Sequence, residues 1–157
     1  MSWVGSDTTE RSTTSGTAVT LSTVSGLSIA AGTPIYIRCN IRKTTGAANV
    51  GFIGLTLNST IVITPVSAFS ATNQAEEGIA EFYVPPRVTG YLRSSQVQLR
   101  SATASGATWV INSDTKGGAN DLPTVAITSV VITGYSGDAL ITTAIDEVQV
   151  YTMGTGA

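Results

Sequence analysis

Two pairs of adjacent carboxylates are the residues with the greatest capacity for chemistry in this chain. Glu76 and Glu77 form one pair, Asp146 and Glu147 form the other, and Glu81 is close to the first pair in sequence. Two carboxylic acids that flank a glycosidic bond can hydrolyse it. Neighbouring residues of a regular strand point to opposite faces of a sheet, so neither pair brings both groups into one site. We therefore expect solvated carboxylates at strand edges, no catalytic residues and no enzyme.

Metal and cofactor sites have little support in the residue types. Histidine is absent from all 157 residues, which excludes Ser-His-Asp catalysis and His-ligated zinc. The loop from Asn112 to Pro123 offers possible calcium ligands but lacks the spacing of a known calcium loop; they are Asn112, Asp114, Asn120 and Asp121. Lysines beside glycines match no phosphate-binding motif. The sequence predicts no metal and no cofactor.

The stretch IYIRCNIRK, from Ile35 to Lys43, alternates with the period of a β-strand. Its apolar row consists of Ile35, Ile37, Cys39 and Ile41, and its polar row of Tyr36, Arg38, Asn40 and Arg42. If the apolar row faces the core, the chain's single cysteine is a buried, unreactive thiol. The basic side chains then lie on the outer face. They can pair with acids on an adjacent strand or contact another subunit.

Aromatic side chains that can stack on sugars keep a binding role open. The candidates are Tyr83, Tyr91, Trp109, Tyr135 and Tyr151. Trp109 shares its parity with Ile111, which favours a position in the core.

Composition indicates a folded sheet protein. Hydrophobic residues make up 42% of the chain and charged residues only 11%, so the polar surface consists mainly of hydroxyls. A net charge of −2 and the absence of a long basic run argue against nucleic acid as a partner. No segment has the roughly eighteen apolar residues of a membrane span, and the N-terminus lacks a signal-peptide layout. We expect no membrane partner and synthesis in the cytoplasm.

Strand-period alternation and turn clusters recur along the chain, and no segment has a sustained helical stripe. The sequence predicts an all-β fold, an antiparallel β-sandwich of eight or nine strands. The number of strands favours a jelly-roll-like arrangement over an immunoglobulin-like one. The candidate strands are residues 17–24, 34–43, 50–57, 60–66, 76–84, 91–101, 107–113, 123–134 and 139–152.

Three segments depart from simple alternation. Residues 1–16 are polar, with Trp3 and Val4 as apolar anchors, so we expect an arm that is free or docked on a partner, followed by a single domain over residues 17–157. Removal of the arm is expected to spare the fold. Residues 126–135 are apolar at both parities, which favours a subunit contact. The parity of the last strand changes near Asp146, which predicts a β-bulge.

The overall layout resembles the jelly-roll decoration proteins that sit as trimers on the capsids of tailed bacteriophages. The resemblance is carried by the polar arm, by TLSTVSGLSIAAGTPIYIRCNIRK and by the closing TSVVITGYSGDALITTAIDEVQVYTM. It implies a structural virion protein, made in the host cytoplasm and located on the capsid surface.

In that role a homotrimer would bind between subunits of the major capsid protein and cement the capsid. The candidate partner-binding residues are Trp3, Val4, Arg38 and Arg42. Two alternatives stay open: a carbohydrate- or receptor-binding module of a tail fibre, and an accessory domain of an enzyme.

Overall fold

The computed structural model describes residues 1–44, 50–69, 75–86, 94–103, 106–117 and 125–154. These residues form strands and no helix, and so contain no helix that could span a membrane. The strands are β1 (Ser2–Asp7), β2 (Arg11–Thr13), β3 (Val19–Ile29), β4 (Ile35–Lys43), β5 (Gly51–Leu57), β6 (Thr60–Ser67), β7 (Glu76–Val84), β8 (Ser94–Thr103), β9 (Gly106–Gly117), β10 (Ile127–Ser136) and β11 (Thr143–Thr152).

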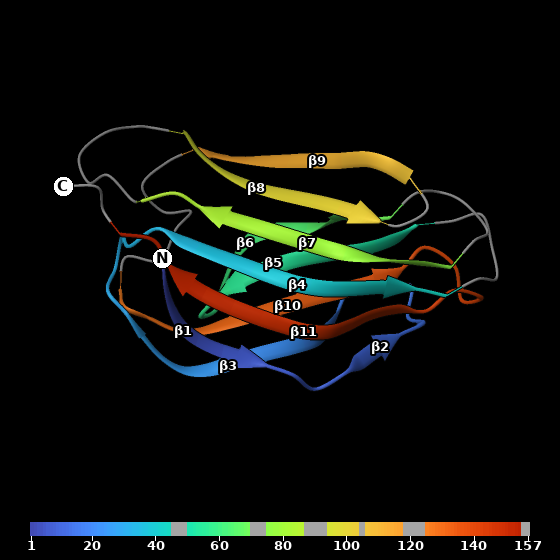
Figure 1. Cartoon of the computed structure of the whole chain (residues 1–157), viewed down its shortest axis with the longest axis horizontal. Coiled ribbons are helices and arrows are strands. Elements are labelled where there is room, and N and C mark those ends of the chain that lie inside the picture. The colour runs from blue at the N-terminus through green and yellow to red at the C-terminus, as the bar shows by residue number, and fades with distance from the viewer. Residues whose placement is uncertain (45–49, 70–74, 87–93, 104–105, 118–124, 155–157) are drawn as a thin grey trace.

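The strands form two antiparallel sheets stacked as a sandwich (Figure 1). The large sheet has the order β1-β11-β4-β7-β8-β9, with β2 also paired to β11, and the small sheet has the order β3-β10-β5-β6. All nine strands expected from the sequence are present, with ends that differ by a few residues. The predicted all-β sandwich is confirmed.

The pairing pattern is that of a jelly roll, a long hairpin wound into a sandwich. Strands β1 and β2 pair with β11, β3 pairs with β10, β4 with β7, and β5 with β6. Along the chain, β3, β4 and β5 alternate between the two sheets. The hairpin of β8 and β9 extends the large sheet beyond this set, at the top of the view in Figure 1.

Strand β4 shows how the alternating sequence produces the core. Its apolar row lies between the sheets with an exposed fraction of 1% or less: Ile35, Ile37, Cys39 and Ile41. Each such aliphatic side chain stabilises the fold by about 1.5–3 kcal/mol through burial. Burial also raises the pKa of the Cys39 thiol, which disfavours a reactive thiolate. The predicted buried cysteine is confirmed.

The β-bulge expected near Asp146 is also present. The register of β11 against β4 shifts between Ile145 and Glu147, so Asp146 is the additional residue. Because of this shift, Ile145 and Val148 both point into the core although they differ in parity.

Residues 1–16, which were expected to form a polar arm that is free or docked on a partner, contain β1 and β2, and these strands extend the chain's own large sheet along β11. Val4 is a bulge residue that packs against the core. A side chain at Gly5 would approach Leu27 within 2.8 Å, so glycine permits the close contact between β1 and the opposite sheet. This segment pairs with β11 mainly through backbone hydrogen bonds, and these bonds do not require apolar side chains. A polar sequence can therefore form the two strands.

The first turn also differs from the expectation. The first candidate strand was expected to end at residue 24, but β3 continues to Ile29. Gly26, with φ of 72°, accommodates an irregularity within the strand, and the chain turns at Gly32, with φ of 79°.

Removal of residues 1–16 should therefore destabilise the fold. It deletes the packing of Val4 and the hydrogen bonds of β1, and we expect the free energy of unfolding to fall by roughly 3 kcal/mol or more. Urea denaturation followed by circular dichroism measures this change. Val4→Ala should cost about 1 kcal/mol, and Ser6→Ala, at an exposed position of the same strand, is the control. An unchanged unfolding midpoint after truncation would show that the arm is dispensable.

Candidate functional site

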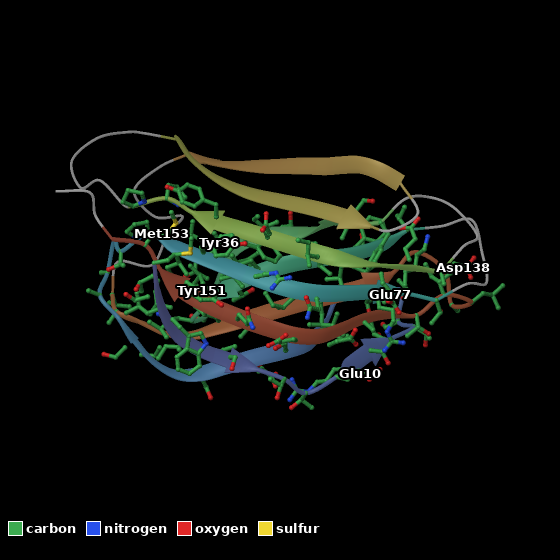
Figure 2. The ribbon with its side chains drawn as sticks, in the orientation of Figure 1. Glu10, Tyr36, Glu77, Asp138, Tyr151 and Met153 are labelled. Atoms are coloured by element: carbon green, nitrogen blue, oxygen red, sulfur yellow. The ribbon has the colours of Figure 1, made fainter. Side chains whose placement is uncertain are left out.

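The outer face of the large sheet carries four aromatic residues in one line, which we call the aromatic row. Trp3 on β1 faces Tyr151 on β11, Tyr151 faces Tyr36 on β4, and Tyr36 faces Tyr83 on β7. Directly opposed residues project from the same face of a sheet. Three strand spacings of about 4.8 Å give the row a length of roughly 14 Å. Figure 2 shows Tyr36 and Tyr151 on their neighbouring strands.

The aromatic row has one open end. Trp3 lies on the edge strand and is 61% exposed, whereas the three tyrosines are partly buried. The ring centroids of Tyr36 and Tyr151 are 6.0 Å apart with an interplanar angle of 43°, a normal aromatic pair geometry. The row thus offers an apolar strip across four strands.

A second line of residues, the polar row, runs beside the first at a distance of about 7 Å along the strands. It consists of Ser6, Gln149, Arg38 and Glu81. The Tyr36 hydroxyl donates to Glu81 at 2.5 Å, and the Tyr151 hydroxyl donates to Gln149 at 2.9 Å. Burial and the bond to Glu81 raise the pKa of Tyr36 to about 12, so Tyr36 stays a donor. These bonds fix the orientation of both rings.

A shallow depression lies farther along the same face. It has a volume of about 410 Å³ and is lined by Asn40, Ile41, Glu77, Gly78, Ile79 and Asp146. At its side, the Glu147 carboxylate accepts hydrogen bonds from Asn40 at 3.1 Å and from Gln149 at 2.8 Å. The network therefore connects the depression to the polar row.

Only the first of the two carboxylate pairs is separated as expected for a regular strand. The bulge in β11 leaves Asp146 and Glu147 on the same outer face, where they accept hydrogen bonds from Arg42 and Asn40. Glu77 is exposed on the outer face, whereas Glu76 is buried with its carboxylate 3.9 Å from the Lys43 ammonium group. Burial lowers the pKa of Lys43, and the charge of Glu76 opposes that shift.

The four candidate partner-binding residues occupy different environments. Trp3 and Arg38 lie on the outer face, in the aromatic row and the polar row. Val4 is partly buried and packs against the core. Arg42 donates to Asp146 at 3.2 Å and also to Glu10, and these two bonds raise its pKa. Arg42 therefore ties the connection between β1 and β2 to the large sheet.

The aromatic row as a unit was missed by sequence reasoning. The sequence marks Tyr83 and Tyr151 as possible sugar platforms, Tyr36 as an outer residue and Trp3 as an anchor of the arm, but their alignment depends on the register of four strands. The side chains of Tyr91 and Trp109, and the oxygen-rich loop from Asn112 to Pro123, lie outside the part of the chain whose side chains are described. The described residues contain no cluster of three or more metal ligands.

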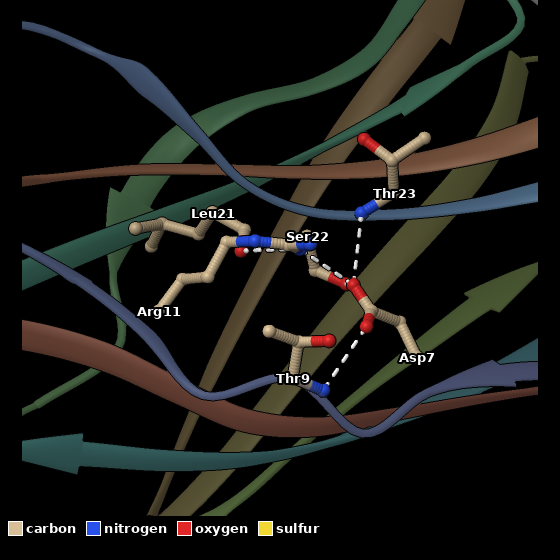
Figure 3. Close-up of polar contacts among 6 residues, drawn as sticks. All are labelled: Asp7, Thr9, Arg11, Leu21, Ser22 and Thr23. Atoms are coloured by element: carbon tan, nitrogen blue, oxygen red, sulfur yellow. Dashed lines mark hydrogen bonds and ion pairs between the residues drawn. The ribbon is translucent and has the colours of Figure 1, made fainter.

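The Asp7 carboxylate holds β1, and hence Trp3, in place (Figure 3). It accepts hydrogen bonds from the Thr9 amide at 3.0 Å, the Ser22 hydroxyl at 2.8 Å, the Thr23 amide at 3.4 Å and Arg11 at 2.6 Å. Because Ser22 and Thr23 belong to β3, these bonds join the two sheets at their edge. Burial alone would raise the pKa of Asp7, but the hydrogen bonds outweigh it and hold the pKa well below its usual range.

Comparison with known proteins identifies no family. No family model and no curated protein matches the chain. Among solved structures, it is similar to the VP2 subviral particle of infectious bursal disease virus (16% identity, 96% of this chain, 31% of that chain, TM-score 0.43). It is also similar to the CBM2 module of the evolved Dit of Lactobacillus casei BL23 phage J-1 (16% identity, 86% of this chain, 71% of that chain, TM-score 0.44).

A third similar structure is lectin II from Ulex europaeus (9% identity, 93% of this chain, 99% of that chain, TM-score 0.44). The chain spans about a third of the VP2 chain. What the protein binds is therefore inferred from its own surface.

Asp7→Asn should lower stability in a pH-dependent way. The native pKa of Asp7 lies below the unfolded value of about 3.9, so its stabilisation is complete above about pH 5 and is lost as the pH falls through the acidic range. We expect a loss of about 1–3 kcal/mol at pH 7 and a smaller difference from the native protein at pH 3. Urea denaturation at both values tests this, with exposed Glu77→Gln as the control. A difference that does not change with pH would contradict it.

Proposed function

We propose that this protein is a non-catalytic recognition module that binds a carbohydrate or glycosylated receptor on the outer face of its large sheet. The observation that carries the proposal is the aromatic row of Trp3, Tyr151, Tyr36 and Tyr83. The apolar face of a sugar ring packs against aromatic rings, while its hydroxyls need hydrogen-bonding partners at the rim of the contact.

The polar row supplies those partners. Glu81 and Gln149 provide carboxylate and amide groups, and Arg38 lies between them in register. Among the described residues Arg38 takes part in no ion pair, so its N–H groups can donate to a ligand. Because tyrosine hydroxyls are already bonded to Glu81 and Gln149, little side-chain entropy is lost on binding. Such a module would serve as the receptor-binding part of a tail fibre.

Trp3→Ala should reduce glycan affinity by about tenfold or more, equivalent to roughly 1.4 kcal/mol of binding free energy. A glycan array identifies ligands of the native protein, and isothermal titration calorimetry compares the variants. Ile61→Ala is the matched control, because Ile61 is 57% exposed on a strand of the small sheet. Binding that survives Trp3→Ala unchanged, or an array without any bound glycan, would contradict the proposal.

A second candidate function is capsid decoration. It is favoured by the side-chain types of the outer face, because Trp, Tyr and Arg are the residues most concentrated at the centres of protein interfaces. A second supporting feature is the small sheet, whose strands β3, β5, β6 and β10 contain no charged residue. In this role the protein would form a homotrimer on the capsid surface and bind between subunits of the major capsid protein.

The decoration role predicts a different set of measurements. Light scattering should give the mass of a trimer at micromolar concentration, and the protein should co-sediment with undecorated capsids. Trp3→Ala should weaken that binding, whereas Val4→Ala, at an inward-facing position, should affect stability more than binding. A monomer that does not co-sediment would eliminate this role and leave the glycan-binding proposal.

A further inference from the structure

We infer that the ligand is a neutral glycan of several sugar rings that lies across the strands along the aromatic row. This inference rests on the proposed glycan-binding function and adds the direction, length and charge of the ligand. Three features of the outer face carry it: the continuity of the aromatic row, its open end, and the balance of charges beside it.

The direction follows from what lies next to each aromatic side chain. Along β4, Tyr36 is followed on the same face by Arg38, and along β11, Tyr151 is preceded by Gln149. On β7, Glu81 precedes Tyr83 in the same way. Apolar contact is therefore interrupted along the strands and continuous only across them. A sugar chain gains the most stacking contact when it crosses the strands.

The length follows from the extent of the row. Three strand spacings, roughly 14 Å, exceed the width of a single pyranose ring, so a monosaccharide can occupy only part of the row. Trp3 stands on the edge strand with most of its surface exposed. A longer chain can therefore continue past the edge of the sheet without meeting the protein. The geometry favours oligosaccharides over single sugars.

The charge follows from the groups beside the row. In the polar row, which adjoins the aromatic row, Glu81 and Arg38 face each other in register and carry opposite charges. Three further carboxylates lie farther along the strands, toward the depression: Glu77, Asp146 and Glu147. Arg42 is already bonded to Glu10 and Asp146. On β4 and β7 the polar row therefore carries no net charge, and the carboxylates farther along the same face repel an anionic sugar. A neutral glycan is the ligand class that this surface fits.

Calorimetric titration with sugars of matched linkage tests all three features. The neutral probes are β-1,4-linked glucose and mannose oligomers from one to six units, and the anionic probe is a β-1,4-linked oligomannuronate series. For a neutral series we expect the affinity to rise by about tenfold or more from monosaccharide to tetrasaccharide. In Trp3→Ala, with its melting temperature as a folding check, the gain at the longer lengths should shrink.

Glu81→Gln separates the charge argument from stacking. It keeps the shape of the side chain but removes the carboxylate that accepts hydrogen bonds from sugar hydroxyls. Neutral binding should therefore weaken, whereas the oligomannuronate should bind better than it does to the native protein. Preferential binding of the anionic series by the native protein, abolished by Arg38→Gln, would overturn the neutral assignment and leave the glycan-binding function intact. Absence of binding to every probe, together with an empty glycan array, would overturn both.

Discussion

Pairing between the first and last strands is the constraint on which the rest of the structure depends. Strand β11 lies between β4 and β1, so its inward residues Val148 and Val150 are covered only if both neighbours are in place. An unpaired edge at β11 would expose a row of backbone donors and acceptors to water or to another chain. The N-terminal strand closes that edge with backbone hydrogen bonds, and Val4 adds a small apolar contact.

This closure also makes the proposed binding face. Trp3 belongs to the aromatic row only while β1 is paired, so stability of the sandwich edge and affinity for a ligand on that face are thermodynamically linked. Asp7 links the stability of this edge to the affinity for a ligand, because it anchors β1 to Ser22 and Thr23 of the opposite sheet. A ligand that contacts Trp3 would therefore favour the same paired state that Asp7 stabilises.

Period-2 alternation allowed the nine long strands to be predicted from the sequence, and the change of parity near Asp146 revealed the bulge. Strands β1 and β2 gave no such signal, because a short edge strand held by backbone bonds tolerates serine, threonine and glycine. The individual aromatic residues were visible, but their alignment was not. Trp3 and Tyr151 lie near opposite ends of the chain, and register between distant strands depends on the whole wound hairpin rather than on any local pattern.

The two outer faces of the sandwich hold their aromatic residues in opposite ways. On the small sheet, Phe52 and Tyr135 stack on each other with centroids 4.2 Å apart and an interplanar angle of 8°, so each ring covers a face of the other. On the large sheet, Tyr36 and Tyr151 are 6.0 Å apart and tilted by 43°, and their hydroxyls are held by Glu81 and Gln149. Rings bonded at the hydroxyl and separated from each other keep surface available to a ligand. This difference favours the large sheet as the face of the proposed recognition site, while the small sheet, whose strands contain no charged residue, suits contact with another protein surface.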